Sequence, residues 1–168
     1  MKKILFGLLV VGLTTQAFSQ VIKTEELSEV VVMATNYKYL SDVDSKEAPV
    51  DAKLLERMVA SFDVKDSEFY QDEYDLYNVT FFIPDGKILA AYDKDGKVLR
   101  TVEKFKDINV PEVVRNSVYK RFPGWMISKD VYLVNYHQEK GANRRYKLKL
   151  VNGDKTLRVK TDEDGNFL

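Results

Sequence analysis

The stretch of sequence that decides the fold is residues 77–105, YNVTFFIPDGKILAAYDKDGKVLRTVEKF. Apolar and polar side chains alternate in it, and a period of two is typical of a strand with one buried face. The alternation occupies three runs: 77–83, 87–92 and 97–105. Pro84-Asp85-Gly86 and Asp93-Lys94-Asp95-Gly96 lie between the runs and favour tight turns. We therefore predict three consecutive antiparallel strands.

A helical pattern comes before these strands, and the whole arrangement then follows a second time. Asp51 can cap a helix whose apolar residues share one face, namely Leu54, Leu55, Met58, Val59 and Phe62. Pro111 opens a second helix, Pro123-Gly124 ends it, and the side expected to be buried consists of Val113, Val114, Ser117, Val118 and Phe122. Further strands are predicted at 125–137, 145–151 and 156–161. The predicted fold class is α+β, with two α-β-β-β repeats forming an antiparallel sheet whose helices pack on one face.

The two repeats also match residue by residue. Five pairs of identical residues are each 69 positions apart: Tyr77/Tyr146, Asp93/Asp162, Asp95/Asp164, Gly96/Gly165 and Leu99/Leu168. We expect one domain over residues 51–168, made of repeats 51–105 and 106–168.

The N-terminus has the pattern of a secretory signal peptide. Lys2 and Lys3 precede the apolar run 4–13, and Ala17-Phe18-Ser19 predicts cleavage before Gln20. The run is too short for a stable membrane span, which needs about 20 residues. We therefore expect residues 1–19 to be removed and the product to be periplasmic or secreted, without a stable membrane span.

Residues 20–50 are expected to hold a strand and a linker. The β-branched run at 29–34 favours a strand, and the polar run 41–50 favours a linker. Residues 27–32, LSEVVV, also look like a TonB box, although the long receptor sequence that should accompany one is missing.

Composition excludes several classes of function. The chain has 26 Lys+Arg, 26 Asp+Glu, one His and no Cys. A net charge near zero argues against a general nucleic-acid binder. The lack of Cys excludes disulfides and thiolate chemistry, and a lone His137 makes a poor metal site. We expect no enzymatic activity and no cofactor, although sequence alone does not exclude hydrolysis by a pair of carboxylates.

Several segments together resemble a known family. They are Tyr92-Asp93-Lys94-Asp95-Gly96, Leu99, Val110-Pro111, Arg121-Phe122-Pro123-Gly124-Trp125, Tyr146-Lys147-Leu148 and Asp162-Glu163-Asp164-Gly165. In these segments the chain resembles the PepSY-like proteins, periplasmic or secreted proteins of Gram-negative bacteria related to the beta-lactamase-inhibitor-like fold. The resemblance covers residues 51–168. It implies an α/β binding or inhibitory module and supplies no catalytic residues.

Two sets of residues are candidates for a site. Strand alternation puts Lys147, Lys149, Arg158 and Lys160 on one face of the sheet, where they could dock an acidic partner or form an ordinary solvated face. The acidic segment 63–75 could lie against this face, within the chain or in a second copy. Tyr132 and Tyr136 lie on one side of the strand at 125–137, whose other side, with Val131 and Leu133, is also largely apolar. Such a strand is either covered on both sides or exposes a patch, so the two tyrosines could be interface anchors or core residues.

The sequence thus predicts a non-enzymatic module that binds or inhibits a protein or peptide of the cell envelope through Tyr132, Tyr136, Lys147, Lys149, Arg158 and Lys160. A homodimer is a further expectation. The alternative is an envelope protein that binds a small molecule or calcium through Asp93, Asp95, Asp162 and Asp164. The EF-hand pattern is missing, because position 12 counted from Asp93 is Lys104.

Overall fold

The computed structural model describes residues 36–168. The predicted signal peptide and the predicted strand at 29–34 lie outside the described residues. Within the described part, no helix is long and apolar enough to cross a membrane.

Six strands form one antiparallel sheet, and each strand pairs with the next along the chain, in the order β1-β2-β3-β4-β5-β6. The strands are β1 (Leu76–Ile83), β2 (Gly86–Asp93), β3 (Val98–Lys106), β4 (Met126–His137), β5 (Gly141–Asn152) and β6 (Lys155–Asp162). The β3–β4 pair joins the two repeats, with Glu103 opposite Val134. The prediction of one continuous sheet from two α-β-β-β repeats is confirmed.

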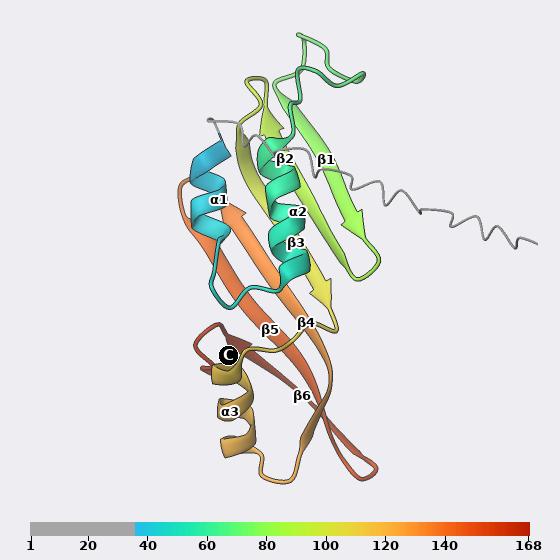
Figure 1. Ribbon diagram of the computed structural model, residues 1–168, viewed down its shortest axis with the longest axis vertical. Coiled ribbons are helices and arrows are strands. Elements are labelled where there is room, and N and C mark those ends of the chain that lie inside the picture. Colours follow the sequence, from blue (N-terminus) through green and yellow to red (C-terminus); the bar gives the residue numbers. More distant parts are fainter. Residues whose placement is uncertain (1–35) are drawn as a thin grey trace, which may run out of the picture.

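Three helices cover one face of this sheet (Figure 1): α1 (Tyr37–Val43), α2 (Val50–Ser61) and α3 (Glu112–Arg121). Helix α2 packs on β1 and β2, and α1 packs on α2, β4 and β5. The linker predicted from residue 41 is wrong at its start, because α1 continues to Val43. This short helix has no side-chain cap, and the burial of Tyr39 and Val43 holds it in place.

The buried side of α2 differs from the predicted one. Leu54 and Met58 are 51% and 45% exposed, whereas Leu55 and Val59 are fully buried, as is Ala52. The prediction that all five apolar residues face the core is therefore wrong. The helix is rotated so that Glu56 enters the interior at 1% exposure.

Each repeat contains a turn of the same geometry, which follows β2 in the first repeat and β6 in the second. In the first, the Oδ1 of Asp93 accepts the N–H groups of Asp95 and Lys97, both at 2.9 Å. In the second, the Oδ1 of Asp162 accepts those of Asp164 and Asn166, at 3.0 and 2.8 Å. A glycine with positive φ closes both turns, as the left-handed region requires. The offset of 69 residues thus reflects two structurally equivalent turns.

Candidate binding face

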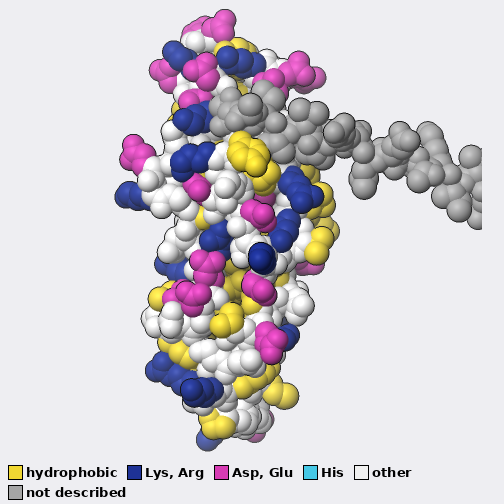
Figure 2. Space-filling model, turned by 60° about the vertical axis from the view of Figure 1, so that its left-hand side comes forward, with side chains coloured by type: hydrophobic (Ala, Val, Ile, Leu, Met, Phe, Trp, Pro, Cys, Tyr) yellow, Lys and Arg dark blue, Asp and Glu magenta, His cyan; other side chains and the backbone are white. Residues whose placement is uncertain are grey.

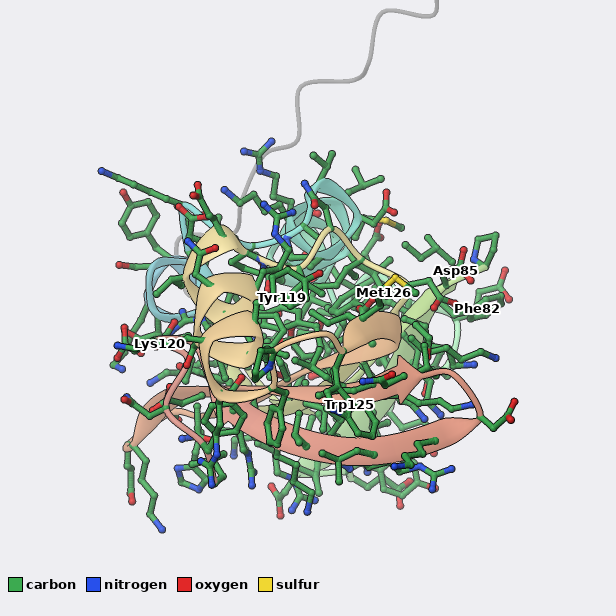
Figure 3. All side chains as sticks on the ribbon, turned by 90° about the horizontal axis from the view of Figure 1, so that it is seen from below. Phe82, Asp85, Tyr119, Lys120, Trp125 and Met126 are labelled. Atoms are coloured by element: carbon green, nitrogen blue, oxygen red, sulfur yellow. The ribbon has the colours of Figure 1, made fainter. Side chains whose placement is uncertain are left out.

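The face of the sheet opposite the helices, here called the helix-free face, is strongly basic. The register of β2–β6 places ten cationic side chains on it: Lys87, Arg100, Lys104, Lys106, Lys129, Arg145, Lys147, Lys149, Arg158 and Lys160. Lys147 lies opposite Lys160, and Lys149 lies opposite Arg158. The prediction that these four share one face is confirmed. Several side chains that project from this side of the strands end in nitrogen (Figure 3).

Acidic side chains are nearly missing from this face. Within the strands, only Asp93 and Asp162 have its parity, and each is the last residue of its strand. Both carboxylates accept backbone N–H groups of their own turns. The other acids in strands, Glu103 and Asp130, lie on the helix side. Charge is therefore segregated, although the whole chain carries equal numbers of cations and anions.

The ten cations make no salt bridge with any residue among 36–168: the four ion pairs found there involve other cations. Like charges that lie directly opposite each other in a sheet are destabilising. Figure 2, which presents another side of the molecule, shows acidic and basic side chains interspersed. The helix-free face thus holds uncompensated positive charge.

Apolar side chains run between these cations. Val131 lies between Lys106 and Lys147, and Leu133 between Lys104 and Arg145. Further toward β1, Val102 and Leu89 are 52% and 44% exposed. A groove of about 360 Å³ opens among β4, β5 and β6, and its lining includes Lys129, Val131, Lys147, Lys149, Arg158 and Lys160. An apolar floor with a cationic rim suits an acidic partner that also carries apolar groups.

The two tyrosines predicted for this site lie elsewhere. Tyr132 and Tyr136 are 0% and 3% exposed and point to the helix side. Tyr132 stacks on Tyr146 with 5.0 Å between ring centroids, and Tyr136 meets Tyr39 edge-on at 5.1 Å. The prediction that they line the binding face with the lysines is therefore wrong. Strand alternation separates the two faces of β4 but does not say which face the helices cover.

The acidic segment 63–75 does not lie against the predicted basic residues of its own chain. Its aromatic side chains Phe69, Tyr70 and Tyr74 pack on Tyr77 of β1. Since β1 and β6 are opposite edges of the sheet, the intramolecular docking of this segment on β5 and β6 is wrong. The segment occupies the end of the molecule drawn at the top of Figure 1, and acidic side chains gather at the same end of Figure 2.

A buried polar cluster lies under the helices. Glu103 of β3 is fully buried, and its Oε1 accepts hydrogen bonds from the hydroxyls of Tyr39 at 3.0 Å and Thr101 at 2.6 Å. The carboxyl group of Glu56 interacts directly with that of Glu103. One oxygen of each carboxyl, Glu56 Oε1 and Glu103 Oε2, has no other hydrogen-bond partner in the described part of the chain. A proton held by one carboxyl and donated to the other would supply a hydrogen bond between them.

The pKa values agree with this arrangement. Burial raises the pKa of Glu56 to about 9, and the neighbouring Glu103 carboxyl adds to the rise. Burial also raises the pKa of Glu103, although hydrogen bonds from Thr101 and Tyr39 oppose the rise. Because both carboxyls are enclosed, they are out of reach of a substrate. The pair is a structural element rather than the carboxylate pair of a hydrolase.

The remaining candidate metal ligands, His137 and the aspartates of the two turns, form hydrogen bonds within their own turns. The Nδ1 of His137 accepts the N–H of Glu139 at 3.2 Å in the turn after β4. The first aspartate of each Asp-x-Asp-Gly turn is engaged by backbone N–H groups. No group of three or more His, Asp or Glu side chains among residues 36–168 could hold a metal ion.

Sequence reasoning missed six of the ten cations of this face, namely Lys87, Arg100, Lys104, Lys106, Lys129 and Arg145. Alternation in β3 could have revealed two of them, since Lys104 and Lys106 alternate there with the buried Glu103 and Phe105. It also missed the Glu56–Glu103 pair, for which the sequence gives no signal because the two residues meet only through the tertiary fold.

Comparison with solved structures finds a distant similarity. The chain is similar to a BLIP-like protein from Bacteroides fragilis, with 15% sequence identity and a TM-score of 0.33, over 58% of this chain and 68% of that one. No family model matches the chain, and no curated protein matches it.

Proposed function

We propose that the chain is a non-enzymatic protein-binding module, exported to the cell envelope, whose helix-free face binds an acidic stretch of another protein or peptide. The observation that carries the proposal is the set of ten cations that form no ion pair with any residue in the described range 36–168. Opposing like charges cost folding stability. A cluster of like charges that lowers folding stability and has no counter-charge is typical of a surface that binds a partner of opposite charge.

The chemistry of the partner follows from the face. Carboxylates of the partner would meet Lys147, Lys149, Arg158 and Lys160, and apolar side chains would pack on Val131 and Leu133. Rim charges of this kind chiefly speed association, and salt screens them, so binding should weaken as ionic strength rises. Occupation of a partner's working surface in this way would inhibit it.

Fluorescence anisotropy with a labelled oligoglutamate peptide tests the proposal. The double variant Lys147→Glu/Arg158→Glu should weaken binding about tenfold or more. The matched control is Arg57→Glu/Lys120→Glu, which reverses two exposed charges on α2 and α3. Equal affinity of all three proteins would contradict the proposal. A pull-down from envelope extract with the same three proteins would then identify the natural partner.

A small-molecule ligand is the second candidate, and the groove favours it. Its volume of about 360 Å³ is within the range of ligand pockets. Its cationic rim would select an anionic ligand with an apolar part. Such a ligand would raise the melting temperature of the protein and lose that effect in Lys149→Glu. Calcium, tested in the same way, should produce no rise if the Asp-x-Asp-Gly turns are purely structural.

A further inference from the structure

The two edge strands of the sheet differ in how they are protected. The edge strand of a sheet has unpaired N–H and C=O groups that can hydrogen-bond to a strand of another molecule. Proteins usually prevent such pairing with charged side chains on the edge strand or with a segment that covers it. Edge strand β6 contains Lys155, Arg158 and Lys160. The C-terminal tail also covers part of it, because Thr161 bridges to Phe167 and the Leu168 N–H donates to the Lys160 carbonyl at 3.0 Å. This edge is guarded in both ways.

Among residues 36–168, edge strand β1 has neither protection. Its eight residues, LYNVTFFI, contain no charge and no proline. Its register with β2 is uninterrupted from Leu76 to Ile83, so no bulge distorts the edge. Phe82 is 78% exposed and Leu76 is 46% exposed. Figure 3 shows Phe82 and Asp85 together at the periphery of the molecule, away from Tyr119 and Lys120 of α3.

The two ends of β1 carry opposite charge. Asp72, Glu73 and Asp75 come immediately before the strand. At its other end, Lys87, Lys104 and Lys106 gather beside Ile83 and the turn, with Asp85 as the one acid among the residues that line that hollow. Two antiparallel copies of β1 would place the acidic end of each against the basic end of the other. A parallel pair would oppose acid to acid.

We propose that β1 is a dimerisation edge, at which a second copy of this chain adds its own β1 antiparallel across a two-fold axis. Residues of equal parity would then face each other, so that the apolar helix-side residues Val79 and Phe81 meet their counterparts. The two sheets merge into one, with both helix-free faces on the same side. Each dimer thus presents two binding faces to a partner, which strengthens binding to a repetitive or dimeric target.

Sedimentation velocity of the purified protein over a range of concentrations tests this. The wild-type protein should form a dimer. Thr80→Lys/Phe82→Lys, at exposed positions of β1, should weaken the dimer about tenfold or more. Thr156→Lys adds a lysine to the opposite edge strand, β6, and should leave the dimer unchanged. Circular dichroism melting confirms that each variant is folded. A wild-type monomer at every concentration, or equal effects of lysine at the two edges, would overturn the proposal.

A charge exchange tests the antiparallel arrangement. Lys87→Glu/Lys104→Glu makes both ends of β1 acidic, and Asp72→Lys/Glu73→Lys makes both ends basic. Each variant alone should dimerise weakly, whereas an equimolar mixture should restore the dimer, because every acidic end then meets a basic one. Failure of the mixture to restore it would overturn the two-fold arrangement. Because the readout is self-association, the result is independent of whether the helix-free face binds an acidic partner.

Discussion

The carboxyl groups of Glu56 on α2 and Glu103 on β3 contact each other in the interior, where they are 1% and 0% exposed. Arg144, whose charge lowers the pKa of both carboxyls, donates instead to the Asp42 carbonyl at 2.6 Å and to Glu163 at 3.3 Å. The pair therefore keeps a proton, and that proton joins a helix to the centre of the sheet. Two buried acids so placed make the stability of the fold depend on pH.

The sign of this dependence follows from the pKa of Glu56. Its ordinary value is 4.5, and the folded protein raises it to about 9. Between these values the folded state holds more protons than the unfolded chain, so the free energy of unfolding falls as pH rises. Glu56→Gln keeps a hydrogen-bond donor and removes the titration. We expect it to be more stable than wild type by about 1–3 kcal/mol at pH 8.

Urea unfolding of the two proteins from pH 5 to pH 9 measures this effect. The difference should be small at the acidic end and grow with pH. Glu68→Gln, at an exposed site, is the control and should follow wild type throughout. If Glu56→Gln destabilised the protein equally at all pH values, the shared proton would be refuted.

Opposed cations on the helix-free face should lower stability. Lys160 lies opposite Lys147, so Lys160→Gln removes a like-charge pair. We expect it to raise the free energy of unfolding by about 0.5 kcal/mol at low salt, with a smaller gain at high salt. Lys155→Gln is the control because Lys155 lies opposite the neutral Asn152. Thermal melting at two salt concentrations gives the comparison, and a gain that did not depend on salt would argue against charge repulsion.

The two equivalent turns should differ in their tolerance of a side chain. Gly96 and Gly165 have φ of 77° and 81°, so alanine strains both by about 1 kcal/mol. A Cβ at Gly96 would meet nothing within 4 Å, whereas at Gly165 it would lie 2.9 Å from the Ser117 Cβ and 3.1 Å from the Val113 carbonyl oxygen. Gly165→Ala should therefore cost more than Gly96→Ala by about 1–2 kcal/mol. Urea unfolding of both variants decides this, and equal costs would contradict the packing of α3 on the second turn.

Local patterns predicted much of this fold. Turn sequences such as Asp93–Gly96, flanked by alternating apolar and polar residues, are sufficient to predict the strands and their antiparallel order. These signals depend only on residues that are close in sequence. The short helix α1 escaped prediction because it has no cap and no acid in its first turn, and tertiary burial of Tyr39 stabilises it.

The candidate binding face was predicted only in part, because tertiary contacts decide which face of a strand is buried. Alternation grouped Lys147 with Lys149 and paired them with β6, which the register confirms. It could not say which face of β4 the helices cover, so Tyr132 was assigned to the surface. The burial of Glu56 could not be predicted from the sequence. A buried carboxyl needs a specific polar partner, and Glu103 is brought next to Glu56 only by the tertiary fold.

Binding of an acidic partner should perturb the helix-free face and leave the helices unaffected. Titration of ¹⁵N-labelled protein with oligoglutamate, followed by NMR, tests it most directly. We predict shifts in the amide signals of the helix-free face, centred on Lys147, Lys149, Arg158 and Lys160, which weaken with added salt while the signals of α2 and α3 stay in place. Shifts centred on the helices, or no shifts at low salt, would contradict the account.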